Sequence, residues 1–206
     1  MTFFVNNVSP SLIGALFVLP RLYKAMGGIS STMQTSYTDM TPQQRANQYF
    51  GNTENGKKHG EGSLFDENGD LVYEGEWKED KRCGKGKSYA TKGSGQQYDY
   101  EGSFIDDKRH GVGIDLYANG EIHYDGDFQD DLYDGNGVLY KFVDTQKRNN
   151  ADKPLYSGKF KLGKRHGYGI EYDESDQAIY QGNWIRDKRE GKGVDLHLGK
   201  EVYIGE

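Results

Sequence analysis

A tyrosine followed two residues later by a glycine recurs along this chain, and the repeat constrains the fold more than any other feature. Successive tyrosines of the motif lie 24, 27, 24, 32, 24 and 23 residues apart. The seven copies are Tyr49/Gly51, Tyr73/Gly75, Tyr100/Gly102, Tyr124/Gly126, Tyr156/Gly158, Tyr180/Gly182 and Tyr203/Gly205. Such spacing is typical of repeat proteins, in which each unit is one supersecondary element that packs on its neighbours.

Two further positions complete each unit. In six units a Gly-x-Gly pair begins nine residues after the first glycine, at Gly60, Gly84, Gly111, Gly135, Gly167 and Gly191. Five units carry an aromatic residue two positions after the Tyr-x-Gly glycine, namely Trp77, Phe104, Phe128, Phe160 and Trp184. Because Tyr73, Gly75 and Trp77 stand at i, i+2 and i+4, they share one face of a β-strand. Each unit is therefore expected to be a β-hairpin.

The composition indicates what fills the space between the strands. The chain has 16 Tyr, 9 Phe and 2 Trp beside 29 Gly, and it is poor in aliphatic residues. We therefore expect rings to supply the packing, and both glycines of each Gly-x-Gly pair to leave room for rings from neighbouring strands. The dipeptides Asn68-Gly69 and Asn119-Gly120 tolerate positive φ and are expected to connect one unit to the next.

These patterns predict an all-β fold. Residues 49–206 are expected to form an elongated, single-layer antiparallel meander of repeated β-hairpins, with six units and a partial seventh. With about 4.8 Å between strands and two strands per unit, each unit advances the sheet by about 10 Å. Thr41-Pro42 is typical of a helix start, so a short lead-in helix is expected over residues 41–48.

The stretches "YEGEWKEDKRCGKG" and "YSGKFKLGKRHGYG" carry the Tyr-x-Gly-x-aromatic motif, a basic turn and the Gly-x-Gly pair. This pattern closely resembles the MORN (membrane occupation and recognition nexus) repeat family over residues 49–206. The resemblance implies a single-layer sheet used as a scaffold. The fourth unit departs from the pattern because "DDLYDG" replaces the basic turn, so the turn chemistry is expected to be lost there.

Several motifs resemble catalytic or metal-binding sites, but their recurrence follows from their position in the repeat. His59, His110 and His166 occupy the same position in alternate units, about 20 Å apart, so they cannot share a metal ion. Cys83 fills that position in another unit. A Gly-x-Gly phosphate site needs a helix to follow, whereas strand residues follow here. We therefore predict no enzyme, no metal and no cofactor.

Charged residues give the remaining site hypotheses. Carboxylate pairs such as Asp106-Asp107 and Asp130-Asp131 lie in turn segments, where acidic residues favour local backbone bonding. A net charge of -6 argues against a nucleic-acid partner. Basic pairs precede five of the Gly-x-Gly pairs and are expected to line one sheet edge: Lys57, Lys58, Lys81, Arg82, Lys108, Arg109, Lys164, Arg165, Lys188 and Arg189. Nearby carboxylates largely neutralise this edge. Binding of anionic lipid headgroups is therefore one interpretation of it, and binding of an acidic protein partner or simple exposure to solvent are the alternatives.

The first 40 residues differ from the rest, because they are apolar and their first acidic residue is Asp39. We interpret residues 2–19 as a marginal membrane anchor, expected to be helical, with polar residues in its first half. A chain segment packed on protein and a mitochondrial targeting sequence are the alternatives. The residues assigned to the anchor and its basic flank are Leu12, Ile13, Leu16, Phe17, Val18, Leu19, Arg21 and Lys24.

Together these features predict a non-catalytic structural subunit. We expect an accessory component of a membrane-bound multi-protein complex, with the mitochondrial inner membrane favoured as its location. Two alternatives remain open: a cytoskeletal or ciliary scaffold, which the family resemblance implies, and a tether that contacts anionic lipids through the basic edge.

Overall fold

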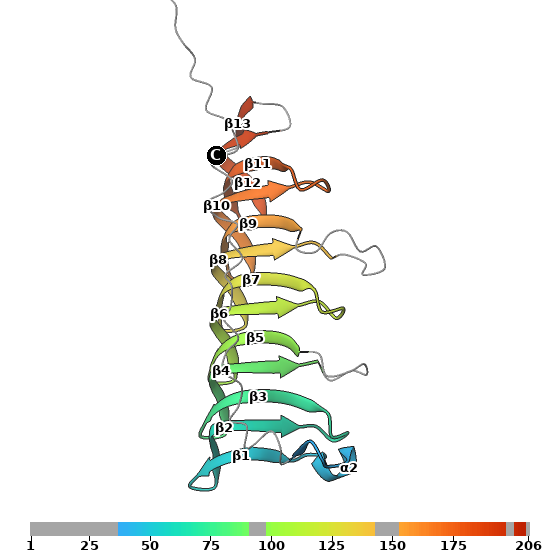
Figure 1. The fold of residues 1–206 in the computed structure, drawn as a ribbon. Helices are drawn as coiled ribbons and strands as arrows, with labels where there is room; N and C mark the ends of the chain where they lie inside the picture. Colours follow the sequence, from blue (N-terminus) through green and yellow to red (C-terminus); the bar gives the residue numbers. More distant parts are fainter. Residues whose placement is uncertain (1–36, 91–97, 143–152, 197–199, 205–206) are drawn as a thin grey trace, which may run out of the picture.

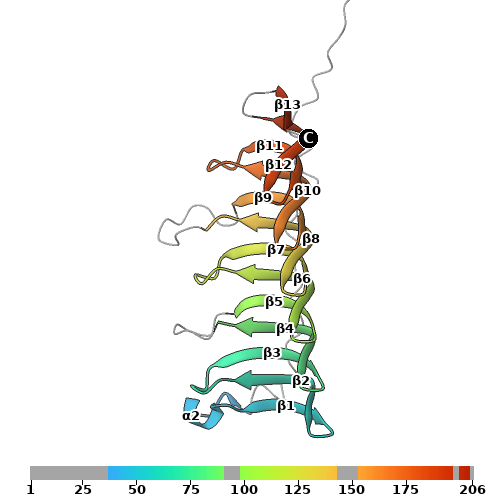
Figure 2. The ribbon, with the colours of Figure 1, turned by 180° about the vertical axis from the view of Figure 1, so that it is seen from behind.

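The computed structural model describes residues 37–90, 98–142 and 153–196, together with the backbone of residues 200–204. Its thirteen strands form one antiparallel sheet in which the spatial order follows the chain order. The molecule is elongated, with the hairpins stacked along one axis (Figures 1 and 2). The strands are β1 (Tyr49–Glu54), β2 (Lys57–Phe65), β3 (Leu71–Lys78), β4 (Lys81–Tyr89), β5 (Tyr98–Ile105), β6 (Lys108–Leu116), β7 (Ile122–Gln129), β8 (Leu132–Tyr140), β9 (Pro154–Lys161), β10 (Lys164–Tyr172), β11 (Ala178–Ile185), β12 (Lys188–Asp195) and β13 (Lys200–Ile204). This arrangement confirms the predicted meander of hairpins. The apolar segment assigned to an anchor lies outside the described residues.

A short helix, α2 (Pro42–Arg45), precedes the sheet. The Thr41 hydroxyl accepts a hydrogen bond from the Gln44 backbone N–H, and the Gln44 side chain accepts one from the Thr41 N–H. This capping box satisfies two amide groups at the helix start. The helix is shorter than the expected range of 41–48, because Ala46 and Asn47 leave the helical conformation and lead into β1.

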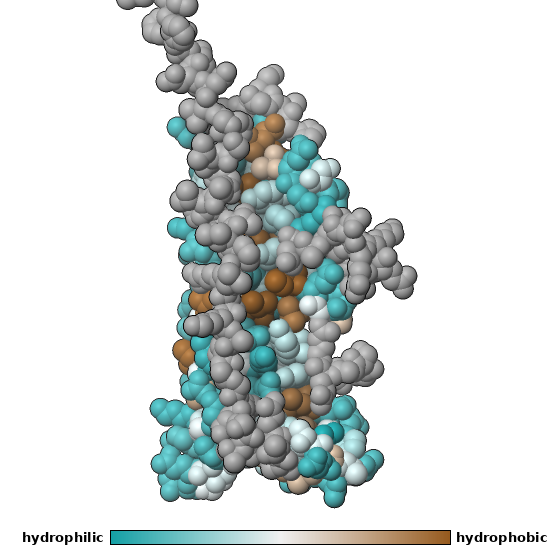
Figure 3. Space-filling view, viewed as in Figure 1, coloured by the Kyte–Doolittle hydropathy of each residue, from teal (hydrophilic) through white to brown (hydrophobic). Residues whose placement is uncertain are grey.

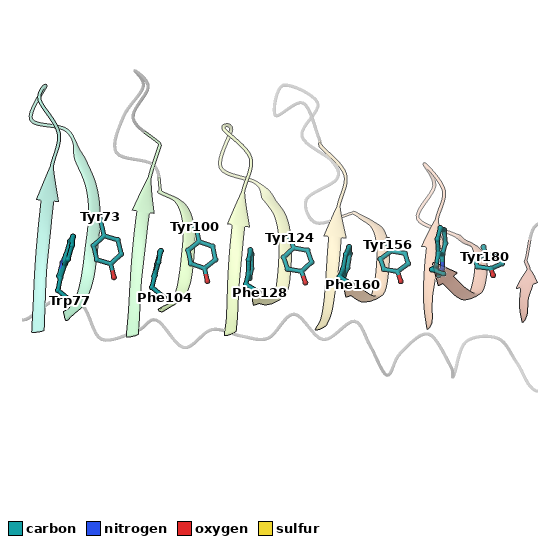
Figure 4. Close-up of a cluster of buried hydrophobic side chains, with 10 residues drawn as sticks. Tyr73, Trp77, Tyr100, Phe104, Tyr124, Phe128, Tyr156, Phe160 and Tyr180 are labelled. Atoms are coloured by element: carbon teal, nitrogen blue, oxygen red, sulfur yellow. The ribbon is translucent and has the colours of Figure 1, made fainter. Parts of the chain in front are cut away.

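The core is a continuous file of rings on one face of the sheet (Figure 4). The ring of Tyr100 makes an edge-to-face contact with Phe104 of its own strand and another with Phe128 of the next unit, at centroid distances of 5.1 and 5.0 Å. The same zigzag repeats between the other units, and each contact stabilises the sheet by about 1 kcal/mol beyond area burial. Packing by rings, expected from the composition, is confirmed.

The two glycines of each Gly-x-Gly pair have different functions. The second glycine leaves space for a ring: a Cβ on Gly113 would lie 2.4 Å from the Tyr100 hydroxyl oxygen. The first glycine adopts positive φ, which is +65° at Gly111, and a Cβ there would meet only Ser103 at 3.6 Å. The expectation that both glycines make room for rings is therefore wrong for the first one, which provides the left-handed backbone of a bulge.

The tyrosine hydroxyls also satisfy the backbone at these bulges. Tyr100 donates to the Ser103 carbonyl at 3.0 Å and Tyr124 donates to the Asp127 carbonyl at 3.0 Å. Each hydroxyl reaches a carbonyl three residues along its own strand, where the regular ladder is interrupted. The tyrosine thus acts twice, as a buried ring and as a hydrogen-bond donor, and phenylalanine could supply only the first role.

The two long edges of the sheet differ. Two-residue turns within units lie along one edge, and the longer connections between units lie along the other (Figure 1). Asn68-Gly69 and Asn119-Gly120 do connect successive units, but within longer turns in which only the glycine has positive φ. In one view, hydrophobic residues gather along the middle of the molecule and hydrophilic ones along its margins (Figure 3).

Candidate functional site

Six two-residue turns form a row along one long edge of the sheet, which we call the turn edge. Both residues of each turn have positive φ, between 49° and 76°. This geometry is a type I′ turn, whose twist matches that of the flanking strands. The six turns are Asn55-Gly56, Glu79-Asp80, Asp106-Asp107, Asp130-Asp131, Leu162-Gly163 and Arg186-Asp187.

The ten predicted basic residues all lie along the turn edge, because each pair begins the second strand of its unit. The first residue of each pair is exposed. In units two and three this lysine is neutralised: the Lys81 ammonium lies 3.0 Å from the Asp106 carboxylate, and the Lys108 ammonium lies 3.7 Å from that of Asp130. Exposed ion pairs of this kind contribute little to stability.

The second residue of each pair folds inward over the rings. The Arg109 guanidinium lies 5.6 Å from the Tyr100 centroid and 5.3 Å from that of Phe128, so it covers the contact between two units. Cation–π contacts of this kind contribute about 0.5–2 kcal/mol. The residues in this inner position are Lys58, Arg82, Arg109, Arg165 and Arg189. Half of the predicted basic edge therefore covers the core.

The turn carboxylates join neighbouring units. The Asp131 carboxylate accepts a hydrogen bond from the Arg109 backbone N–H at 2.9 Å, and the Asp131 N–H donates to the Arg109 carbonyl at 3.0 Å. The same pair of bonds links Asp187 to Arg165. These carboxylates lie in turns as predicted, but they bond the preceding turn and not their own. The sequence contains a signal for this bond between units, because an Asp recurs two residues before the inner basic residue, as in Asp107/Arg109 and Asp187/Arg189.

The fourth unit keeps its turn, so the expected loss of turn chemistry is wrong. Asp130-Asp131 form the same two-residue turn as in other units. Tyr133 takes the inner basic position and stacks on Tyr124, with ring centroids 3.8 Å apart and an interplanar angle of 11°. A ring fills the place of a guanidinium because both are flat and pack on an aromatic face.

Asp115 is the centre of a polar network next to this substitution. Its carboxylate accepts hydrogen bonds from the Tyr133 hydroxyl at 2.7 Å and from Arg109 at 3.1 Å, and it lies 3.0 Å from His123 Nδ1. Burial would raise the pKa of Asp115, but the bonds from His123 and Tyr133 and the charge of Arg109 together lower it. Burial and the bond to Asp115 raise the pKa of Tyr133. Nothing in the sequence pattern singled out this network, because Tyr133 is unique to its unit.

The recurring histidine position lies beside the bulge in each hairpin. His59 lies 3.1 Å from the Glu54 carboxylate, and burial raises the pKa of the Cys83 thiol. No group of three or more metal-ligating side chains occurs among the described residues. Within the same part of the chain, no helix combines the length and apolar character needed to span a bilayer.

Comparison with known proteins gives a consistent result. A family model described as MORN repeat matches residues 49–71, 73–95, 100–122, 124–141, 156–176 and 180–194. Alsin from Homo sapiens is 30% identical over 141 residues, which cover 68% of this chain and 8% of Alsin. Alsin from Rattus norvegicus is 31% identical over 123 residues, covering 59% of this chain and 7% of Alsin. The chain thus spans less than a tenth of the length of these relatives.

Proposed function

Because this chain belongs to the MORN repeat family, with six matched repeats, we propose that it is a non-catalytic scaffold subunit of a larger protein assembly. The sheet and its turn edge are the surfaces that it offers to partners. The carboxylates of the polar clusters support a non-catalytic function, because they are already bonded within the protein. Asp131 and Asp187 join neighbouring units. Asp115 is bonded to Arg109, His123 and Tyr133.

One observation carries the proposal: the same contacts join every described unit to the next. The ring file continues from Tyr49 to Tyr180, and backbone bonds between turns accompany it. A repeat protein built in this way is stiff along its axis and presents side chains at regular intervals of about 10 Å. Such a rod suits the spacing and alignment of other subunits.

Crosslinking mass spectrometry on the native assembly tests the scaffold function. We expect the protein to migrate in a complex much larger than the 23.3 kDa of this chain, with crosslinks from several repeats to the same neighbours. A protein that migrates as a free monomer in native extracts, without reproducible crosslinks, would overturn the scaffold proposal.

We further propose that the assembly is membrane-bound, with the mitochondrial inner membrane as its location and the segment containing Leu16 and Val18 as its anchor. The apolar composition of residues 2–19, followed by Arg21 and Lys24, supports this placement. By the positive-inside rule the repeats then lie on the matrix side. A cytoskeletal or ciliary scaffold and a tether to anionic lipids are the alternative functions.

The double substitution Leu16→Lys/Val18→Lys is expected to move the protein from the detergent phase to the aqueous phase in temperature-induced phase separation. Two lysines within a marginal span cost about 5 kcal/mol of insertion free energy, which is enough to prevent stable anchoring. Met33→Lys, which lies beyond the apolar stretch, is the matched control and should leave partition unchanged. Wild-type protein found wholly in the aqueous phase would exclude the anchor and favour the cytoskeletal alternative.

A further inference from the structure

The charge of the turn edge is unevenly distributed. In units five and six, residues 161–165 and 185–189 contain six basic residues and one carboxylate. In units three and four, residues 105–109 and 129–133 contain two basic residues and four carboxylates. The turns of units five and six are therefore strongly basic, although those of units three and four carry more carboxylates than basic residues.

Four cations at this end have no acidic partner among the described residues. Arg165 and Arg189 fold inward onto Glu171, and Asp187 is bonded to Arg165. In the part of the chain that the structure describes, no carboxylate lies within ion-pair distance of the remaining basic side chains at the two turns. These outward cations are Lys161, Lys164, Arg186 and Lys188. In units two and three, Lys81 and Lys108 occupy the position of Lys164 and Lys188, and both are paired.

Aliphatic side chains stand among these cations. Leu162 is 67% exposed and Ile185 is 42% exposed. Leu132, which replaces the outer lysine in unit four, is 43% exposed and lies beside the Leu162-Gly163 turn, because a Cβ on Gly163 would be 3.8 Å from its Cδ2. Exposed aliphatic side chains that lie close together among charges are typical of a binding surface.

The two turns are also fixed relative to each other. The Arg165 N–H donates to the Asp187 carboxylate at 2.9 Å, and the Asp187 N–H donates to the Arg165 carbonyl at 3.0 Å. The Arg165 guanidinium lies 4.1 Å from the Trp184 centroid. A partner would therefore meet a surface that is already ordered, which lowers the entropic cost of binding.

We propose that the turn patch, made of Lys161, Leu162, Lys164, Ile185, Arg186 and Lys188, docks an acidic segment of a partner protein that carries aliphatic side chains among its carboxylates. The proposal rests on the scaffold function and specifies one contact of that scaffold. The four unpaired cations complement carboxylates, and Leu162 and Ile185 complement the aliphatic side chains.

A protein segment fits this patch better than a membrane. All six turns lie along the same edge (Figure 1), so a flat anionic bilayer laid on the patch would also approach the turns of units three and four. Asp106, Asp107, Asp130 and Asp131 occupy those turns and are paired with the cations there, so these turns would offer the bilayer no net positive charge. A short segment can contact two turns and avoid the rest.

The test measures binding of an amphipathic glutamate- and leucine-rich peptide to the full-length protein, with a glutamine-for-glutamate peptide as control. Lys164→Glu/Lys188→Glu is expected to weaken binding about tenfold. Lys81→Glu/Lys108→Glu changes the same position in units two and three, where the lysines are paired, and should change binding by less than about twofold. Leu162→Ala/Ile185→Ala should weaken binding several-fold, whereas Ile105→Ala should not.

Three results of the binding test would overturn the proposal, and a fourth could come from the native assembly. Equal loss in both charge-reversed variants would indicate general electrostatics, and equal binding of the glutamine peptide would remove the acidic requirement. Tight binding of phosphatidylserine vesicles that Lys164→Glu/Lys188→Glu abolishes, without peptide binding, would assign the patch to a membrane. In the native assembly, a Lys164→Glu/Lys188→Glu protein that keeps every crosslink refutes only the patch, whereas wild-type protein outside any assembly refutes the scaffold function itself.

Discussion

Replacing Gly113 with valine is expected to destabilise the sheet by at least about 4 kcal/mol and to prevent folding of the third unit. A Cβ at this position would lie 2.4 Å from the Tyr100 hydroxyl oxygen and 2.5–2.6 Å from two carbons of its ring. The ring cannot move away, because it is buried between Phe104 and Phe128. Gly102 pairs with Gly113 on the neighbouring strand, and a Cβ on Gly102 would lie 2.6 Å from the Gly113 Cα. The two backbones are therefore close together here, and the strands could make room for a side chain only by breaking their hydrogen bonds.

Gly111 is the matched control, because it lies two residues away on the same strand. Its φ is +65° and a Cβ would meet only Ser103, at 3.6 Å. Gly111→Asn is expected to cost less than about 1 kcal/mol, since asparagine tolerates this conformation. Gly111→Val should cost more, because a β-branched residue is strained at positive φ. Urea unfolding measures the loss of unfolding free energy in each variant. We expect the loss to be largest for Gly113→Val, smaller for Gly111→Val and smallest for Gly111→Asn. Equal effects of the two valine substitutions would contradict the separate functions of the two glycines.

The sequence was sufficient to predict the hairpin meander, because strand periodicity and repeat spacing are local properties. Tyr73, Gly75 and Trp77 are all buried on one face, as their i, i+2, i+4 spacing predicted. The different functions of Gly111 and Gly113 could not be predicted from spacing, since the bulge depends on how two strands pair. The register changes between Gly102/Gly113 and the next pair, which is a property of the ladder.

The turn edge shows the same limit. Placement of the basic pairs along one edge followed from the repeat, but their charge state depends on contacts between units. Arg109 is folded over rings and bonded to Asp131, whereas Lys164 has no acidic partner among the described residues. A charge count along the sequence weighs these two residues equally. The sequence count already shows a basic end at units five and six, but only the contacts show which cations there are paired.

The number of buried tyrosines leads to a second large effect, which is cooperative unfolding at alkaline pH. Burial raises the pKa of Tyr49 to about 12, and it also raises the pKa values of Tyr73, Tyr124 and Tyr156. In the unfolded chain these phenols ionise near pH 10. Above that pH the unfolded chain releases protons that the folded chain retains, so folding stability falls as pH rises.

This linkage affects how membrane attachment is measured. Washing membranes at high pH would unfold the repeats, so a protein held only by folded contacts would be released together with loosely bound ones. Phase separation in detergent near neutral pH keeps the sheet intact, and for that reason it is the appropriate assay for Leu16→Lys/Val18→Lys.

We expect stability to be constant with respect to tyrosine ionisation below about pH 9 and to decrease steeply from about pH 10 upward, with the midpoint of unfolding below the folded-state pKa values. In one titration, the part of the tyrosinate absorbance that comes from the buried phenols should rise together with the loss of the circular dichroism signal, because these phenols ionise only as the sheet opens. Tyr124→Phe removes one such group and should make the transition less steep, although it also loses the bond to the Asp127 carbonyl. Tyrosinate absorbance that reaches its full value near pH 10 while the circular dichroism stays constant would show that the core phenols are accessible in the folded protein, and it would contradict the buried file of rings on which the scaffold depends.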